Sequence, residues 1–267
     1  MAARLVFGAA ALFIATRFGI AHYPTTVHEW RVVALLALMQ NVVPFALFAW
    51  GEQRISSSLA SVLNATTPLF TAVLAAGAGV VGEQIDRRRV AALAAGTAGV
   101  IVIMQPWRSG GGQVLGDLAC LAAAACYGIG FVYTARYITG RMPSTAAAVG
   151  QVTTGAVMAT VVAIVVSLAT HSTPHVDVKI AASVATLGVF GTGLAYLLMY
   201  YLLYTTGPTA TAAVTFVMPL IGVVLGVLVL GESVGWNVAL GGALVLVSLL
   251  AVRRRAASAE PLVKTFT

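Results

Sequence analysis

Pro68 and Pro219 lie inside apolar stretches of the sequence, and each follows a polar residue by four positions. Asn64 precedes Pro68, and Thr215 precedes Pro219. A proline within a helix has no N–H donor and disturbs the carbonyl group four residues earlier. Each stretch therefore offers a loosened backbone acceptor beside a polar side chain, which could bind a polar ligand by hydrogen bonds. The alternative is a packing kink whose carbonyl group is satisfied by a neighbouring serine or threonine.

A second group of candidate residues recurs every four positions, at Thr192, Tyr196, Tyr200 and Tyr204. Residues four apart lie on one face of a helix, so this spacing predicts one polar and aromatic stripe. Tyr204 is expected near a membrane surface, where tyrosine rings gather. Tyr196 and Tyr200 lie deeper and are expected to line a pathway. Weaker candidates, whose types also serve in packing between helices, are Tyr127, Tyr133, Gln151 and Thr154.

Residue types that carry catalysis or bind metals are missing from the centres of the apolar stretches. No Asp, Glu, Lys or His lies at such a centre, so neither a carboxylate proton relay nor a catalytic pair is predicted. Asp117, Glu83 and Glu232 are expected as solvated charges at helix ends. The four histidines lie in connections without the spacing of a metal site. We expect no metal, no cofactor and no enzymatic activity.

The elements that must position these residues are membrane helices. Sixty per cent of the 267 residues are hydrophobic and 9% are charged, and the mean hydropathy is +0.96. Continuous apolar runs of about 20 residues indicate helices rather than the alternating strands of a membrane barrel. The net charge of +7 is spread singly or in threes between these runs, which favours a role in membrane orientation over nucleic-acid binding. The lipid bilayer is therefore an expected partner, and nucleic acid is not.

The pattern predicts an all-α integral membrane protein with nine visible transmembrane helices. The short connections are richer in Lys and Arg on one side than on the other, which places the C-terminus in the cytoplasm and suggests a multi-pass protein of the inner (plasma) membrane. The expected spans are 3–20, 32–50, 57–81, 90–106, 115–138, 145–170, 178–204, 208–231 and 234–252.

A repeated pattern divides the chain into two halves. Residues 43–68 align without a gap with residues 194–219, each match lying 151 positions later, and after the proline both copies continue as an apolar run that ends in Gly-Glu. The first copy has two extra residues before its Gly-Glu. The same offset places Asn41 opposite Thr192. Matching spans lie five apart and so cross the membrane in opposite directions, which predicts an inverted repeat of the kind found in secondary transporters.

Pairing the spans in this way leaves the fifth span, 115–138, without a partner. We therefore expect one more helix before Met1 and a bundle of ten helices arranged as two times five, with its first helix missing from this chain. The upstream DNA tests this expectation. The predicted domains are an N-terminal repeat (1–106), a C-terminal repeat (107–253) and a cytoplasmic tail (254–267).

Four features follow one another along the chain: "RLVFGAAALFIATRFG" (4–19), a helix pair with a short loop, "PLFTAVL" (68–74) and "PLIGVVLGVLVLGE" (219–232). In this order they resemble the EamA family of the drug/metabolite transporter superfamily. That resemblance covers nearly the whole chain and implies ten helices in two inverted repeats of five. It also implies efflux of small organic metabolites such as amino acids. From the residues alone we expect only a polar, neutral cavity lined by hydrogen-bonding and aromatic groups.

The leading hypothesis is thus a secondary transporter that exports a small-molecule solute by alternating access between its two halves. A multidrug exporter or an uptake permease of the same family is an alternative. A third possibility is an inactive or assembly membrane protein that lacks its first helix. A homodimer is left open.

Overall fold

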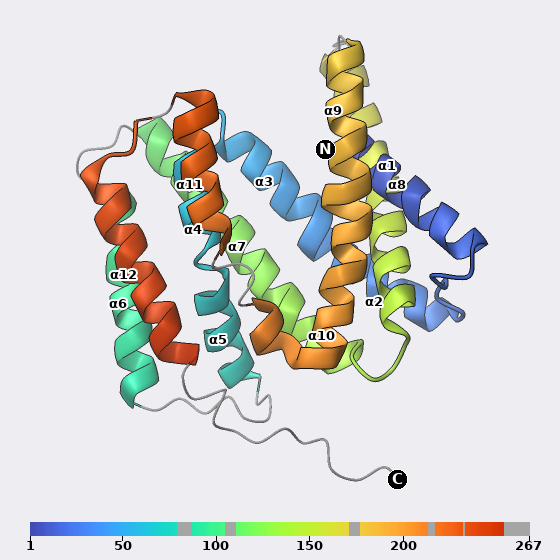
Figure 1. The fold of residues 1–267 in the computed structure, drawn as a ribbon, viewed down its shortest axis with the longest axis horizontal. Helices are drawn as coiled ribbons and strands as arrows, with labels where there is room; N and C mark the ends of the chain where they lie inside the picture. The colour runs from blue at the N-terminus through green and yellow to red at the C-terminus, as the bar shows by residue number, and fades with distance from the viewer. Residues whose placement is uncertain (79–86, 105–110, 171–176, 213–216, 232, 254–267) are drawn as a thin grey trace. The chain divides into compact units, whose positions relative to one another are not determined.

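The computed structural model describes residues 1–78, 87–104, 111–170, 177–212, 217–231 and 233–253 (Figure 1). Within these ranges every regular element is a helix, and no strand occurs. In chain order the elements are α1 (Ala2–Arg17), α2 (Val27–Ala37), the π-helix η1 (Leu38–Val42), α3 (Val43–Gly51), α4 (Ser57–Asn64), α5 (Thr67–Gly77), α6 (Arg87–Met104), α7 (Gly111–Tyr137), α8 (Ser144–Thr170), α9 (Val178–Gly188), the π-helix η2 (Val189–Leu194), α10 (Ala195–Ala212), α11 (Val217–Leu230) and α12 (Trp236–Arg253).

Five helical stretches in the described part of the chain are long and apolar enough to cross a bilayer. Shorter apolar helices occupy Ala94–Ile103 and Trp236–Ser248. Each of the nine predicted ranges contains one described helix or a run of helices, but a count of nine crossings stays a prediction. The five long stretches are Val27–Gly51, Ser57–Ala75, Gly111–Tyr137, Ser144–Ala169 and Val178–Thr205.

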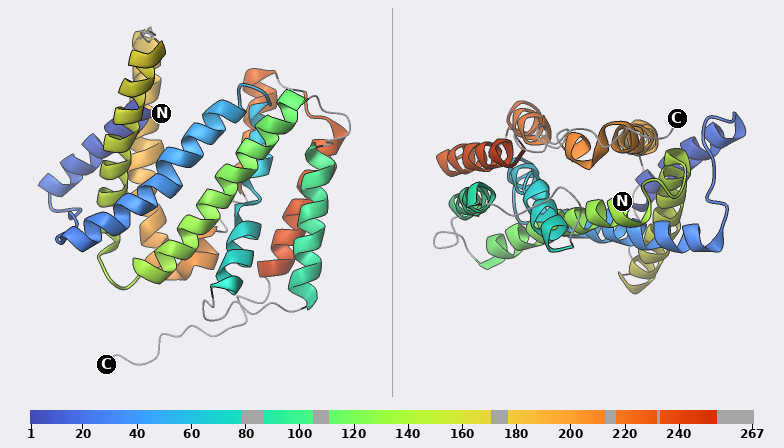
Figure 2. Two further views of the ribbon diagram at one scale, coloured as in Figure 1. Left: turned by 180° about the vertical axis from the view of Figure 1, so that it is seen from behind. Right: turned by 90° about the horizontal axis from the view of Figure 1, so that it is seen from below.

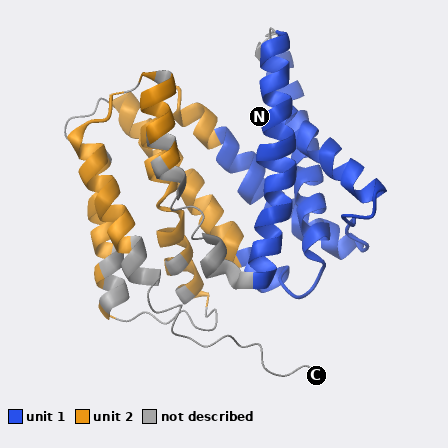
Figure 3. Ribbon diagram, in the orientation of Figure 1, with its two compact units in different colours: residues 1–46, 133–211 blue, residues 47–132, 212–267 orange. Residues whose placement is uncertain are grey.

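The chain folds into two compact units, coloured separately in Figure 3. Unit 1 comprises residues 1–46 and 133–211, and unit 2 comprises residues 47–132 and 212–267. Each unit thus takes helices from both halves of the sequence, so the predicted sequence repeats are not the spatial units. The boundaries of those repeats remain a prediction, and the predicted tail, 254–267, lies outside the described residues.

In unit 1, α1 packs against α8, α9 and η2, while α2 and η1 pack against α8. Two glycines allow α1 to approach α9 and η2 closely. A Cβ atom on Gly8 would lie 3.0 Å from the carbonyl oxygen of Gly188, and one on Gly188 would lie 2.6 Å from the carbonyl oxygen of Arg4. Small residues commonly allow such approach between membrane helices. This crossing fixes the position of Arg4 relative to the η2 segment.

The start of α2 shows how a local signal in the sequence sets a helix end. Thr26 is the N-cap residue, and its side chain accepts a hydrogen bond from the backbone N–H of Glu29. The Glu29 carboxylate in turn accepts from the backbone N–H groups of Thr25 and Thr26. This capping box satisfies donors that the first turn would otherwise leave unpaired. The long helix that carries Gln40 and Asn41 therefore begins at a defined residue.

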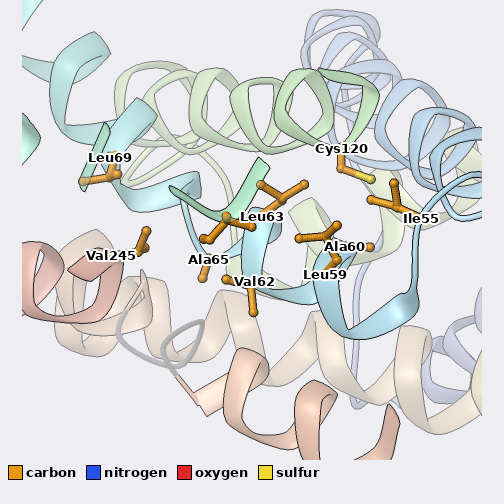
Figure 4. Close-up of a cluster of buried hydrophobic side chains, with 10 residues drawn as sticks. Ile55, Leu59, Ala60, Val62, Leu63, Ala65, Leu69, Cys120 and Val245 are labelled. Carbon is orange, nitrogen blue, oxygen red and sulfur yellow. The ribbon is translucent and has the colours of Figure 1, made fainter. Parts of the chain in front are cut away.

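In unit 2, α6 packs along α12, and α11 packs against α4; Figure 2 shows α6 and α12 side by side in both views. The first contact again uses glycines, since a Cβ atom on Gly99 would lie 2.8 Å from the carbonyl oxygen of Gly241. Buried side chains from α4, α5, α7 and α12 form a hydrophobic cluster that includes Leu59, Leu63, Cys120 and Val245 (Figure 4).

The predicted single span 57–81 is broken in the structure. The helix α4 ends at Asn64, and α5 begins at Thr67, with Ala65 and Thr66 in a turn between them. Pro68 then lies in the first turn of α5, where its missing N–H group costs no helical hydrogen bond. The stretch Ser57–Ala75 is still long and apolar enough to cross a bilayer, but the proline begins a helix inside it instead of kinking a continuous one.

Asp117 also differs from its expected place. The helix α7 begins at Gly111, four residues before the predicted start, so Asp117 lies in its second turn. Its side chain is fully buried, with a relative exposure of 0%. The expectation of a solvated charge at a helix end was therefore wrong for Asp117. Glu83 and Glu232 lie outside the described residues.

Candidate functional site

Two π-helical segments in unit 1 carry polar residues at matched positions. The segment η1 (Leu38–Val42) contains Gln40 and Asn41, and η2 (Val189–Leu194) contains Thr192. η2 begins 151 positions after η1, the same offset that relates the two halves of the sequence. A π-helical turn inserts an extra residue into an α-helix and often marks a functional site. The polar residues thus lie where both long helices depart from regular geometry.

Gln151 of α8 is the centre of a buried hydrogen-bond network. Its Nε2 donates to Oδ1 of Asn41 at 2.7 Å and to Oε1 of Gln40 at 3.2 Å. Its Oε1 accepts from the Tyr200 hydroxyl group at 2.6 Å. All four side chains are at most 3% exposed. Paired polar groups of this kind hold one another in fixed orientations, because an unpaired partner would cost about 1–3 kcal/mol.

Three tyrosines of α10 extend this network along the helix. Tyr200 is fully buried and donates to Gln151. Tyr196 is partly buried and lies near enough to Asn41 and Arg4 to interact with both. Tyr204 donates its hydroxyl group to the carbonyl oxygens of Ile138 and Met142, at 3.1 and 2.7 Å. The predicted stripe thus follows one face of the η2–α10 helix. Tyr196 and Tyr200 belong to the network, and Tyr204 binds the turn after α7.

Arg4 places a positive charge beside this network. Its Nε donates to Thr192 Oγ1 at 2.8 Å, and its Nη2 donates to the Gly191 carbonyl oxygen at 3.0 Å. The guanidinium group also lies over the ring of Phe45, 5.0 Å from its centroid. The extra residue of a π turn loosens the backbone pairing around it. Arg4 therefore ties the start of α1 to this irregular segment.

Asn41 is closely packed, and its amide nitrogen donates to no described group. A Cβ atom on Gly155 would lie 3.2 Å from the Asn41 Cβ atom, so this glycine of α8 makes room for the amide. Asn41 Nδ2 is buried and has no hydrogen-bond partner within the described part of the chain. A buried donor without a partner is costly in a finished protein interior. The group is thus suited to pair with an acceptor atom of a bound solute.

We define the polar cluster as Arg4, Gln40, Asn41, Gln151, Thr192, Tyr196 and Tyr200. Its members come from α1, η1, α8, η2 and α10, and all belong to unit 1. Six of them are neutral amides, hydroxyls or phenols, and none is a carboxylate, thiol or imidazole. The cluster can therefore donate and accept hydrogen bonds, and Arg4 can add an attraction for a negative group. It has no nucleophile paired with a base.

The predicted residues divide between the two units. Five of them, Asn41, Gln151, Thr192, Tyr196 and Tyr200, belong to the polar cluster. Asn64, Pro68 and Tyr127 lie in unit 2. Thr215 lies outside the described residues; Pro219 is within α11, but its side chain is not among those described.

In unit 2, the loosened acceptor expected at Asn64 has a partner. Its carbonyl oxygen accepts from the Thr67 hydroxyl group at 2.8 Å, and its Oδ1 accepts from the same group at 3.3 Å. This is the arrangement of a turn satisfied by a neighbouring threonine, the alternative considered for the sequence. The ring of Tyr127 stacks on Phe48, with centroids 6.2 Å apart.

Two members of the cluster were missed in the sequence. Gln40 adjoins Asn41 in the string "MQNV" inside an apolar run, and this pair of polar neighbours was a usable signal. Arg4 stands near the start of the first apolar run, where arginine is common beside membrane helices. Nothing in its spacing indicates a contact with residues 188 positions away. That contact depends on how α1 crosses η2.

Comparisons with known proteins agree with this picture. The family model described as the EamA-like transporter family matches residues 1–105 and 114–254. A curated relative, the WAT1-related protein At3g02690, chloroplastic, from Arabidopsis thaliana, is 25% identical over 236 residues, which are 86% of this chain and 56% of that protein. This chain thus spans little more than half the length of that relative. A solved crystal structure, 19% identical, shares the fold with a TM-score of 0.66 over 97% of this chain and 88% of its own.

The family match covers most of the chain and includes every member of the polar cluster. Together with the apolar helices, it identifies the molecule as a multi-pass membrane protein of a transporter family. The chain belongs to the EamA-like transporter family.

Proposed function

We propose that the protein is a secondary transporter that exports small organic metabolites with polar groups, such as amino acids, and that the polar cluster binds the solute. The observation that carries this proposal is the chain Asn41–Gln151–Tyr200, buried among apolar helices. Polar groups within a membrane bundle are costly and commonly mark a substrate path. A neutral network beside one guanidinium group suits solutes that combine hydrogen-bonding groups with a carboxylate.

Alternating access between two inverted halves is part of the same proposal. The recurrence of a π-helical segment at an offset of 151 supports it, because a structural irregularity recurs at corresponding positions along with the sequence pattern. Solute sites of inverted-repeat transporters lie where the repeats meet, beside irregular helix segments. We place the protein in the inner (plasma) membrane with a cytoplasmic C-terminus, on the distribution of its basic residues.

The test compares the metabolites released by cells that overproduce the chain with those released by cells carrying two matched variants. Tyr200→Phe removes only the hydroxyl group that donates to Gln151. Tyr201→Phe removes the hydroxyl group of the neighbouring tyrosine, which is 63% exposed. Membrane levels of the three proteins are matched before release is measured.

We expect specific solutes to accumulate outside cells that produce the parent chain and the Tyr201→Phe variant. Tyr200→Phe should lower this release about tenfold, since the loss of a positioning hydrogen bond of about 1.4 kcal/mol corresponds to that factor. Accumulation inside the cells would instead support an uptake permease. Equal release by both variants would show that the polar cluster does not lie on the transport pathway.

A further inference from the structure

Asp117 is a buried carboxylate that the polar cluster does not use. It lies in the second turn of α7, in unit 2, and its side chain is 0% exposed. Neither of its carboxylate oxygens has a hydrogen-bond partner within the described ranges. At about 1.5 Å per residue, it stands roughly 9 Å beyond the start of the helix at Gly111. It is therefore enclosed by protein, not placed at a solvated helix end.

The surroundings of Asp117 are tightly packed. A Cβ atom on the preceding residue, Gly116, would lie 3.0 Å from the side chains of Arg54 and Ile55 and 3.1 Å from the carbonyl oxygen of Gly51. Cys120, one turn further along α7, belongs to the hydrophobic cluster and lies beside Ile55 in Figure 4. This side of α7 thus packs against the turn between α3 and α4 and against apolar side chains.

Three titratable or charged groups lie in the region around Asp117: Cys120, Glu52 and Arg54. Cys120 lies on α7 itself, and Glu52 and Asp117 both interact electrostatically with its thiol group. Arg54, the basic residue of the adjoining turn, is engaged elsewhere: its guanidinium group lies 3.6 Å from the centroid of the Trp50 ring, and Nη1 donates to the Trp50 carbonyl oxygen at 2.9 Å.

The neighbouring helices supply no counter-charge for Asp117. The sequences of α4, α5 and α11 contain no charged residue. The basic residues of α6 are confined to its first turn, about 25 Å along the axis from its last residue. The single basic residue of α12 is its last, Arg253. A negative charge at Asp117 would therefore be buried with no described cation bound to it, while Glu52, the second carboxylate that interacts with Cys120, is exposed.

An isolated ionised carboxylate costs so much to bury that such a group takes up a proton instead. We propose that Asp117 is a proton-binding site, whose carboxyl group is protonated in the arrangement seen here and loses its proton when water reaches α7. In that step the carboxyl O–H bond breaks, the proton passes to a water molecule, and the carboxylate remains. The coupling of this step to solute export rests on the proposed function; the proton site itself does not.

Infrared difference spectroscopy of the purified full-length protein tests the proton site without any solute. The C=O stretch of a protonated carboxyl group is followed while the pH is varied from about 5 to about 9, above the ordinary pKa of Asp. The parent chain is compared with Asp117→Asn and with Asp177→Asn. Asp177 is the matched control, because it is an exposed N-cap residue whose carboxylate accepts from the Val178 N–H group.

We expect a protonated carboxyl band that persists at pH values above the ordinary pKa of Asp in the parent chain and in Asp177→Asn, and its loss in Asp117→Asn. Asp117→Glu keeps the titratable group and should retain a band at a shifted frequency, which guards against a variant that fails to fold. An unchanged band in a folded Asp117→Asn variant overturns the proposal. A band that appears only after Na⁺ is removed also overturns it, since the carboxylate would then hold a metal cation.

A second measurement separates proton coupling from transport itself. Export of a solute found in the release experiment is measured in membrane vesicles with and without a pH gradient. We expect the gradient to stimulate export by the parent chain and by Asp177→Asn, and this stimulation to be lost in Asp117→Asn while downhill flux continues. Export that ignores the gradient overturns the coupling but leaves the proposed function standing. No export by any variant overturns the proposed function, and the infrared band then decides the proton site alone.

Discussion

At the residue scale, the polar cluster depends on a few side chains that each hold several others. Gln151 joins Gln40, Asn41 and Tyr200 through its single amide group. Arg4 joins Thr192 to the backbone of Gly191 through the fork of its guanidinium group. Residue type and spacing alone predicted five of the seven members, since polar residues in apolar runs are conspicuous. Arg4 could not be predicted, because a basic residue near the start of an apolar run has an ordinary explanation in membrane orientation.

The bond between Arg4 and Thr192 should appear as an energetic coupling between the two residues. Arg4→Met removes the guanidinium group, and Thr192→Val removes the hydroxyl group that accepts from Nε. We expect the effects of the two substitutions on thermal unfolding to be non-additive, with a coupling free energy of about 1 kcal/mol, in the range of side-chain hydrogen bonds inside membrane proteins. Thermal unfolding of the detergent-solubilised single and double variants measures it.

Arg17→Met is the control for this cycle. Arg17 is exposed at the other end of α1, where its guanidinium group lies over Phe13. The effect of Arg17→Met on thermal unfolding should add to the effect of Thr192→Val, with no coupling free energy between them. Additive effects for Arg4 as well would show that the contact contributes nothing to stability.

At the element scale, the contact between α1 and the α9–η2 helix has no room for an added methyl group. Gly8 and Gly188 face one another across it. The approximate ranges of the helices could be predicted, because apolar runs between charged connections set their lengths. The two π-helical segments and the break between α4 and α5 could not be predicted. An inserted residue or a turn inside an apolar run is stabilised by contacts from neighbouring helices, which the local sequence does not specify.

Gly188→Ala should destabilise unit 1 and loosen the site. The new Cβ atom would lie 2.6 Å from the carbonyl oxygen of Arg4, which is backbone and cannot turn aside. We expect a loss of about 1–3 kcal/mol, as for other overpacked interiors, measured as a lower midpoint of thermal unfolding. Gly112→Ala is the control, because no atom lies within 4 Å of its added Cβ atom. In a helix that change should be neutral or stabilising by up to about 1 kcal/mol. Equal effects of the two variants would contradict the close approach.

At the scale of the whole molecule, the two compact units and the two sequence halves divide the chain differently. Each unit contains segments from both halves. The apolar composition and the family-like patterns were sufficient to predict an all-helical membrane transporter. The grouping into units was not predictable, because apolar helix faces look alike in sequence and do not specify their partners. The expectation of an inverted repeat gains support from the matched π segments but remains a prediction.

Orientation in the membrane gives a prediction for the whole molecule. The helix α8 (Ser144–Thr170) separates Arg141 from Lys179, both of which are exposed. In a background with Cys120 and Cys126 replaced, we expect Arg141→Cys to react with a membrane-impermeant maleimide only from the cytoplasmic side. Lys179→Cys should react only from the opposite side. Labelling of both positions from one side would show that α8 does not cross the bilayer, and exchanged sides would reverse the proposed orientation.

The paired π segments also constrain how this sequence can change over generations. Each is an α-helix that has absorbed one extra residue. Because the π turn already accommodates that residue, deleting a single codon within 38–42 would let the helix close into regular α geometry while the turns on either side keep roughly their present faces. A deletion in the regular part of α3 would instead rotate all that follows it by about 100°. The same difference holds for a deletion within 189–194 and one inside α10, where the second would turn the tyrosines away from the polar cluster. The two π segments are therefore the places where these helices can lose one residue and stay in register.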